Sequence, residues 1–249
     1  MMSVAPGPFR CSLERARLAA LIVGVGLSGA SCGPGVATPM PEPPTLNLSS
    51  VGPPELVSAP EGDSRHIAGK RGTAPPGAVL RVTNLDQQNP PSVVNVRPDG
   101  SFDVIIGVSS GEELRFDWAL GGEQGAPQDA RVIDDATSFH LEPAARFACV
   151  KLMPGSSLDF AAGATQRFIV RNDCSSTVSL SAPRTRLGSP DFALNTALPL
   201  TVPSAESASL DLSFTRAQSG AREDTLFIDL ANDGTTIRYP ITLRAPASL

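Results

Sequence analysis

The feature that most constrains the fold is a regular alternation of apolar and polar residues in short runs. Apolar side chains take every second position in residues 102–108 and 114–120, and shorter runs of this kind recur within residues 168–182, 207–214 and 226–243. Successive side chains of a β-strand point to opposite faces of its sheet, so this period of two indicates half-buried strands. No run of comparable length follows the 3.6-residue period of an amphipathic helix. The sequence therefore predicts an all-β chain.

Turn signals divide these runs into two groups. Asp99-Gly100 and Asp233-Gly234 each lie between two alternating runs, as is typical of β-hairpins. The first group covers residues 55–142 and the second covers residues 146–249, whereas residues 121–135 are polar, contain glycine and are predicted to form a long loop. Short strands at this spacing are typical of β-sandwiches, so we expect two tandem Ig-like sandwiches.

Three turn motifs precede strands of the first group. They are Gly69-Lys70-Arg71-Gly72, Pro76-Gly77-Ala78 and Asp99-Gly100-Ser101-Phe102. This group resembles the bacterial Ig-like and carboxypeptidase-regulatory-like β-sandwiches, in which a Gly-x-x-Gly precedes a Pro-Gly-Ala strand and a later Asp-Gly-Ser-Phe opens another. Because these motifs consist of residues that favour turns, the resemblance implies a fold rather than an activity.

The second group carries a different set of motifs. They are Leu158-Asp159-Phe160, Phe168-Ile169-Val170-Arg171-Asn172, Asp191-Phe192, Leu210-Asp211-Leu212-Ser213-Phe214, Gly220 and Pro240-Ile241-Thr242-Leu243. On these residues the second group resembles the ASH and major-sperm-protein-like Ig domains. That family consists mainly of non-catalytic interaction modules, so the resemblance implies a binding role.

Residues 1–31 have the parts of an export signal. The basic start holds Arg10, Arg15 and Arg17. The apolar run of residues 18–30 is shorter than the roughly 20 residues of a transmembrane helix and fits the core of a signal peptide. Three small residues then precede Cys32, and this arrangement resembles a bacterial lipoprotein signal peptide, which implies cleavage before Cys32 and acylation of that residue. Ordinary secretory cleavage nearby, and an uncleaved anchor or a wrongly assigned start, stay open as alternatives.

Residues 32–54 are rich in proline and are predicted to form an extended, disordered tether. The net charge of −5, without a large basic cluster, argues against nucleic-acid binding and against electrostatic adhesion to a membrane. Membrane attachment is therefore expected through lipid on Cys32. These features place the protein in the bacterial cell envelope, as an outer-membrane lipoprotein that faces the periplasm or the cell surface.

The four cysteines support export. Cleavage would remove Cys11 and acylation would occupy Cys32, which leaves Cys149 and Cys174 in a compartment where disulfides persist. We expect these two to form a disulfide, with two buried thiols as the alternative. A zinc site is disfavoured because neither histidine is spaced near the cysteines as such a site requires.

The sequence shows no catalytic set. Residues 107–111 match the G-x-S-x-G pattern of serine hydrolases, but that motif needs a strand-to-helix turn and a histidine base. Here it lies between two alternating runs and is predicted to be a hairpin turn. His66 and His140 are predicted to be surface or hydrogen-bonded residues, and no single loop has the acidic spacing of a calcium site. We expect no catalytic residue, no metal and no cofactor.

The sequence thus favours a lipid-anchored, non-catalytic envelope protein that acts as a structural or protein-binding module with an envelope protein as its partner. An envelope hydrolase with a site assembled from dispersed residues is one alternative. An accessory subunit of a secreted enzyme, or of a pilus or motility complex, is another.

Overall fold

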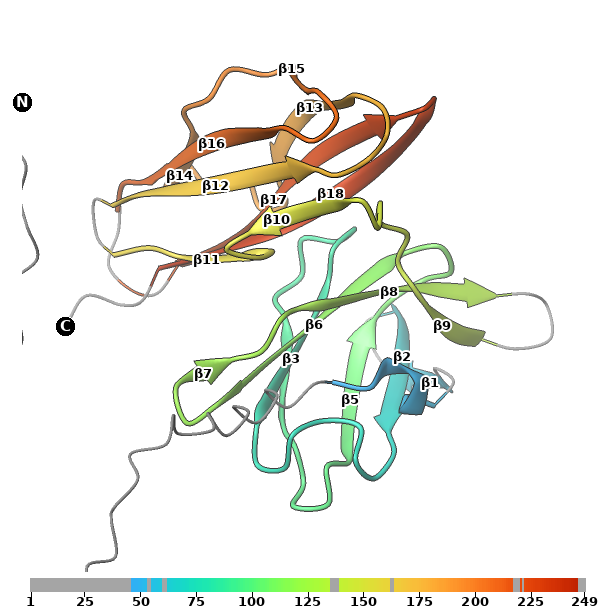
Figure 1. Ribbon diagram of the computed structural model, residues 1–249. Coiled ribbons are helices and arrows are strands. Elements are labelled where there is room, and N and C mark those ends of the chain that lie inside the picture. Colours follow the sequence, from blue (N-terminus) through green and yellow to red (C-terminus); the bar gives the residue numbers. More distant parts are fainter. Residues whose placement is uncertain are drawn as a thin grey trace, which may run out of the picture. The chain divides into compact units, whose positions relative to one another are not determined.

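Two hydrophobic cores organise the strands into two lobes (Figure 1). The computed structural model describes residues 46–52, 55–59, 62–134, 139–161, 164–216, 220 and 222–245, without the side chains of residues 55–59, 62, 63 and 139. The first core contains residues from Leu46 to Leu141, and the second contains residues from Phe147 to Ala245. We name these parts the N-terminal lobe (residues 46–143) and the C-terminal lobe (residues 147–245).

The N-terminal lobe is built from two antiparallel sheets. The smaller sheet has the strand order β1 (Glu55–Ala59), β2 (Gly62–Gly69) and β5 (Phe102–Gly107). The larger sheet has the order β4 (Ser92–Asn95), β3 (Val79–Asn84), β6 (Glu113–Leu120), β8 (Gln128–Asp134) and β9 (Phe139–Pro143), and β7 (Glu123–Gln124) pairs with the end of β6. Phe102 and Val104 of the smaller sheet share one core with Leu80 and Phe116 of the larger one. The lobe is therefore a β-sandwich.

The C-terminal lobe is a second sandwich. Its four-stranded sheet has the order β10 (Val150–Met153), β12 (Thr165–Asn172), β16 (Ser207–Phe214) and β14 (Phe192–Leu194). Its five-stranded sheet has the order β11 (Ser157–Asp159), β18 (Thr235–Ala245), β17 (Arg222–Asn232), β13 (Val178–Thr185) and β15 (Leu200–Val202), with β11 parallel to β18. Phe160, Phe192 and Phe214 pack in its core with ring centroids 5.1–6.2 Å apart.

The all-β prediction is confirmed by the described residues. Their one helix is the short 3-10 helix η1 (Leu48–Ser50). It has neither the length nor the apolar character needed to cross a membrane. The strands follow the alternation seen in the sequence, because Leu210, Leu212 and Phe214 of β16 are buried while the residues between them are more exposed.

Packed structure begins inside the stretch predicted to be a tether. Leu46 is buried in the core of the N-terminal lobe, and Asn47 caps η1 by accepting a hydrogen bond from the backbone N–H of Ser49. Val51 then bridges to Gly69 at the end of β2. Three apolar residues among the prolines, Leu46, Leu48 and Val51, pack against the core, and they were too few to give a periodic signal in the sequence.

The prediction of a long loop over residues 121–135 is wrong. These residues contain β7 and β8, and β8 pairs with both β6 and β9. The physical reason is that Ala130 and Val132 point into the core while the polar residues between and around them point outward. Two small apolar residues make a weak alternation signal, although pairing on both sides makes β8 an interior strand.

Candidate binding site at the junction of the two lobes

Strand β6 is buried on both of its faces. Its apolar residues Leu114 and Phe116 point into the N-terminal core. The alternate residues are charged, yet each has an exposed fraction of 5% or less: Glu113, Arg115 and Asp117. Charged side chains are almost never this buried unless they are paired. Each of the three has at least one partner in the C-terminal lobe, so this face of β6 is the centre of the junction.

Arg115 uses all five of its N–H donors, three of them across the junction to the C-terminal lobe. The other two reach the two carboxylate oxygens of Asp129 on neighbouring β8, at 2.7 and 2.9 Å. The three that cross the junction reach the backbone oxygens of Ser156 and Pro240, at 3.2 and 2.9 Å, and Oγ1 of Thr242, at 2.9 Å. A guanidinium has five donors in a fixed fork, so the cation is completely hydrogen-bonded although it is 1% exposed.

Arg115 and Asp129 each favour the charged form of the other. Burial alone would lower the pKa of Arg115, but Asp129, helped by the charges of Asp117 and Glu113, raises that pKa above its usual value. Burial likewise opposes ionisation of Asp129, yet the Arg115 guanidinium holds the pKa of this carboxyl below its usual range. Both groups are therefore charged at neutral pH.

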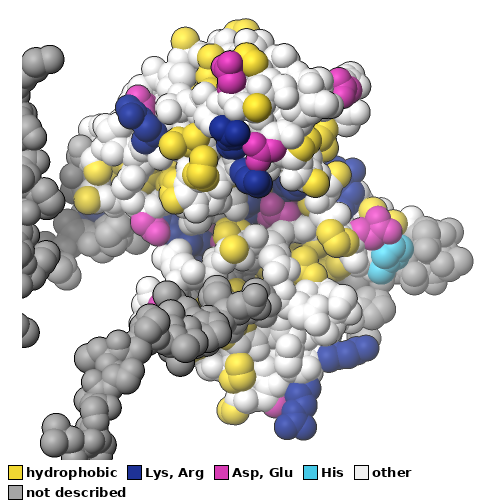
Figure 2. Space-filling view, in the orientation of Figure 1, with side chains coloured by type: hydrophobic (Ala, Val, Ile, Leu, Met, Phe, Trp, Pro, Cys, Tyr) yellow, Lys and Arg dark blue, Asp and Glu magenta, His cyan; other side chains and the backbone are white. Residues whose placement is uncertain are grey.

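Glu113 is held by two arginines at one end of the junction. Arg146, in the linker between the lobes, pairs with Glu113 and also with Asp129 at 2.8 Å. Arg238 of β18 pairs with Glu113 at 3.0 Å and with Asp86 at 2.6 Å. Burial opposes ionisation of Asp86, but the hydrogen bond and charge of Arg238, the backbone N–H of Glu113 and the charge of Arg131 together lower its pKa. Figure 2 shows basic and acidic side chains gathered where the lobes meet.

Asp117 and Glu223 mark the other end of the junction. Arg244 of β18 pairs with Asp117 at 3.2 Å and with Glu223 at 3.3 Å, and it also donates to the side chain of Gln124. Arg81 of β3 pairs with the same carboxylate oxygen of Glu223. Burial, together with the nearby charge of Arg244, lowers the pKa of Arg81 against the opposing effect of Asp117.

A third contact between the lobes uses backbone acceptors. Arg186, which is 7% exposed, donates to the carbonyls of Gln87 and Asn89 at 2.8 and 2.9 Å. Its loop is positioned by the buried carboxylate of Asp224, which accepts hydrogen bonds from the backbone N–H groups of Leu187 and Ser189, at 2.9 and 3.0 Å. The contact therefore depends on fixed backbone geometry in both lobes.

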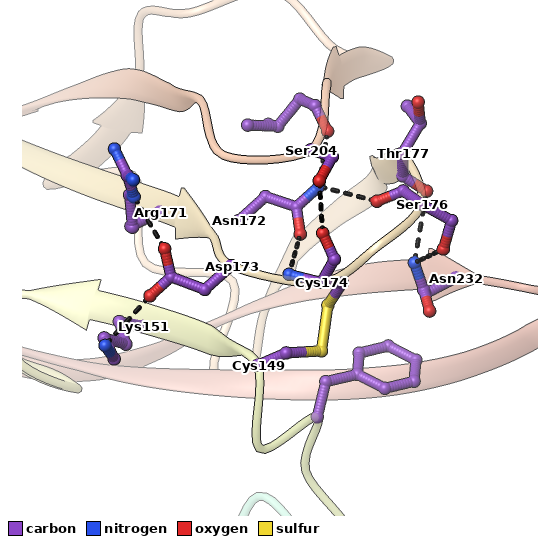
Figure 3. The surroundings of a disulfide bond; sticks show 12 residues. Cys149, Lys151, Arg171, Asn172, Asp173, Cys174, Ser176, Thr177, Ser204 and Asn232 are labelled. Carbon is purple, nitrogen blue, oxygen red and sulfur yellow. Dashed lines mark hydrogen bonds and ion pairs between the residues drawn. A yellow bond between two sulfur atoms is a disulfide. The ribbon is translucent and has the colours of Figure 1, made fainter.

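The linker is anchored by the predicted disulfide. Cys149 and Cys174 are joined, so the start of β10 is tied to the turn after β12 (Figure 3). The backbone N–H of Phe147 donates to the hydroxyl of Tyr239, and the two rings stack with centroids 6.4 Å apart. Both attachments follow Arg146 within three residues, so they restrain the arginine that reaches Glu113 in the N-terminal lobe.

The turn that carries Cys174 is itself rigid. The side chain of Asn172, which is fully buried, donates to the carbonyls of Ser176 and Val202, at 2.8 Å each, and accepts from the backbone N–H of Cys174 at 2.9 Å (Figure 3). Because one amide side chain satisfies three backbone groups, the disulfide is attached to an ordered turn.

Cavities open on both sides of the junction. One of about 270 Å³ lies beside the linker and is lined by the arginines Arg131, Arg146 and Arg238. Two more, of about 240 and 550 Å³, adjoin at the opposite end and share Arg81, Gln124 and Arg244. Carboxylates also line these cavities, Glu113 and Glu142 at the linker side and Asp117, Asp159 and Glu223 at the other. Because arginine stays protonated in proteins, its side chains in these walls are suited to holding carboxylates or phosphates rather than to transferring protons.

The other residues singled out in the sequence do not form a catalytic or metal site in the described structure. Residues 107–111 form the turn between β5 and β6, and a strand follows them instead of the helix of a nucleophile elbow. His66 hydrogen-bonds with Asp103, and His140 with Glu142, at 3.1 and 3.2 Å. Cys32 lies outside the described residues. Among the described residues, no three His, Cys, Asp or Glu side chains are grouped to hold a metal ion.

One sequence pattern could have indicated the charged residues of the junction. The outward face of β6 reads Glu-Arg-Asp, with charges of both signs on a strand whose other face is strongly apolar. A half-buried strand at a solvent surface would show the same pattern, so the sequence alone gives no sign that a second lobe covers it. The partners Pro240 and Thr242 are 125 and 127 residues further along the chain than Arg115.

Comparison with known proteins gives no family. No family model matches the chain, and no curated protein matches it. Among solved structures, the chain is similar to the MSP family member WR4 of Caenorhabditis elegans, with 11% identity and a TM-score of 0.32 over 41% of this chain and 100% of the other. It is also similar to PapD-like domain 7 of human CEP192, with 13% identity and a TM-score of 0.33 over 43% of this chain and 92% of the other. The Escherichia coli chaperone DraB matches with 10% identity and a TM-score of 0.33 over 39% of this chain and 54% of that chain. Similarity at these scores assigns neither a family nor an activity.

Proposed function

We propose that this protein is an exported, lipid-anchored and non-catalytic module that binds a protein partner in the bacterial cell envelope. The observation that supports this proposal is the junction between the two lobes. Its arginines and carboxylates fix two sandwiches against each other through Arg115, which is fully buried and fully hydrogen-bonded. A junction of this kind gives a partner a surface made of both lobes, with preformed cavities along its edge.

The disulfide supports export, because such bonds persist mainly in oxidising compartments outside the cytoplasm. Lipid on Cys32 would then attach the chain to a membrane, with the outer membrane as the expected site. The arginine-lined cavities support binding, since guanidinium groups recognise carboxylates in two-point hydrogen bonds.

The anchor is tested by the intact mass of the protein extracted from membranes, beside a Cys32→Ser variant. We expect a chain that begins at Cys32 and carries acyl mass, and we expect that mass to be missing from the variant. An unmodified mass in the soluble fraction would refute the lipid anchor.

Partner binding is tested by placing a photo-crosslinking amino acid at the junction in intact cells. Arg131, which is exposed and lines the linker-side cavity, is a suitable position, and exposed Arg167 on β12 is the matched control. We expect one discrete crosslinked protein from position 131 and none from position 167. Equal crosslinking from both positions, or none from either, would contradict a specific binding surface at the junction.

A further inference from the structure

The two adjoining cavities at the Arg81 end of the junction form one groove. We name it the Arg81 groove; the residues that the argument uses are Val79, Arg81, Val93, Ala119, Gln124 and Arg244. The lining also contains three carboxylates, Asp117, Asp159 and Glu223, two of which pair with Arg244. The larger cavity has a volume of about 550 Å³, in the range of sites that hold small ligands. The smaller one, of about 240 Å³, extends over the outer face of β3 and β4.

Arg81 has unused hydrogen-bonding capacity in this groove. It donates through Nη1 to Glu223, whose same oxygen also accepts from Arg244. Within the described part of the chain, Nε and Nη2 of Arg81 have no hydrogen-bond partner, and its side chain is 34% exposed. Arg244 differs, because its donors also reach Gln124 and its guanidinium pairs with Asp117.

The local charge favours an additional anion beside Arg81. Burial and the charge of Arg244 lower the pKa of Arg81, so the neighbouring carboxylates do not offset the cost of holding this cation in the groove. A carboxylate placed on the open edge of the guanidinium would offset it, with the two parallel hydrogen bonds that arginine forms best.

An apolar strip lies beside the guanidinium. Val79 and Val93 are 43% and 54% exposed, among the most exposed large apolar side chains of the described residues. Cross-strand pairing places Val79 opposite Ala119, and Val93 opposite Arg81, on one face of the sheet. A ligand that fits both features has an apolar side chain next to its carboxylate.

We propose that the Arg81 groove binds the C-terminal residue of a partner polypeptide. The terminal carboxylate lies on Nε and Nη2 of Arg81, and the last side chain, which is apolar, covers Val79 and Val93. The preceding residues continue past Gln124 and Arg244 into the larger cavity. This inference rests on the proposed protein-binding function and names the part of the partner that is recognised.

The test uses the full-length protein in detergent and pools of hexapeptides that end in Leu, Val or Phe, each made with a free C-terminus and as the C-terminal amide. We expect the free-acid pool to bind and the amidated pool to bind at least tenfold more weakly, because the amide removes the charge that faces Arg81. N-acetyl-leucine serves as the small-acid probe and is expected to bind far more weakly than the peptides.

Two variants locate the binding in the groove. Arg81→Gln removes the guanidinium, and Val93→Asp places a like charge beside the carboxylate at an exposed position where folding is not at risk. Both are expected to weaken binding of the free-acid pool at least tenfold, whereas Arg167→Gln, at an exposed arginine paired with Asp211, leaves it unchanged. Thermal unfolding of each variant checks that the fold is intact.

Several results would overturn the proposal: equal binding of acid and amide pools, full binding by Arg81→Gln and Val93→Asp, or binding of N-acetyl-leucine without binding of any peptide. The crosslink from position 131 distinguishes the proposed protein-binding function from the proposed role of the Arg81 groove. If that crosslink forms unchanged in the Arg81→Gln protein, the groove assignment fails while the protein-binding function stands. If the crosslink is absent altogether, the function itself fails.

Discussion

Arg115 shows how a single side chain decides the structure of the junction. It lies on β6, its carboxylate partner lies on β8, and its remaining acceptors belong to the C-terminal lobe. Leaving one member of a buried ion pair without its partner is costly, because the remaining charge cannot be solvated. The contribution of Arg115 is therefore measured better by removing it than by counting its contacts.

Replacing Arg115 with alanine is expected to reduce the free energy of unfolding by about 3–5 kcal/mol, since the buried Asp129 keeps only Arg146 as a cationic partner and three acceptors of the other lobe lose the Arg115 donor. Urea-induced unfolding followed by fluorescence of the single tryptophan, Trp118, measures this change. Arg167→Ala, which breaks an exposed pair with Asp211, is the control and is expected to cost about 1 kcal/mol or less. Similar losses in the two variants would show that the buried pair is unimportant.

At the scale of elements, the sequence predicted the strands with strong alternation and missed those with weak alternation. β5, β6 and β16 carry apolar residues at every second position, and the burial of these side chains follows that pattern. β8 offers only Ala130 and Val132, so its interior position comes from pairing with β6 and β9, which is not visible locally. The cystine was predictable because few cysteines remained, whereas its role beside the linker required the structure.

The linker between the lobes depends on that disulfide. The bond closes a loop with a sequence separation of 25 residues and holds the segment that carries Arg146. A paired Cys149→Ser and Cys174→Ser variant is expected to lose about 2–4 kcal/mol of unfolding free energy, as chain-entropy estimates give for loops of this size. Guanidinium-induced unfolding checks this value. A single Cys149→Ala variant, with its leftover thiol capped, should reproduce the loss, and an unchanged midpoint in both would refute a stabilising role.

At the scale of the whole described chain, the lobes are joined mainly by charge. Each lobe has its own apolar core, while the described junction between them is formed by six arginines with carboxylate or carbonyl partners: Arg81, Arg115, Arg146, Arg186, Arg238 and Arg244. Sequence patterning finds the two cores because apolar periodicity is local. It does not find the junction, because matching a cation on one lobe to an acceptor on the other requires the folded positions of both.

A junction of this kind makes stability depend on pH in a predictable direction. Arg115 and Arg238 hold the pKa values of Asp129 and Asp86 below the ordinary value of 3.8. A carboxyl with a lowered folded-state pKa stabilises the fold fully above its unfolded-state pKa, and this contribution is lost as the pH falls through the folded-state pKa. We therefore expect the unfolding temperature to change little between pH 5 and pH 7 on this account, and to fall steeply below about pH 4.

The pH dependence also distinguishes the junction from the rest of the surface. Asp129→Asn removes one of the two titrating carboxyls, so its unfolding temperature is expected to be lower at pH 7 but to fall less between pH 5 and pH 2. Asp211→Asn, on β16 in an exposed pair with Arg167 of β12, should leave the steep acid transition as it is in the unmodified protein. If the two variants show the same acid transition, the carboxylates that control acid stability lie elsewhere. The loss of the charged junction would then not be the cause of acid unfolding.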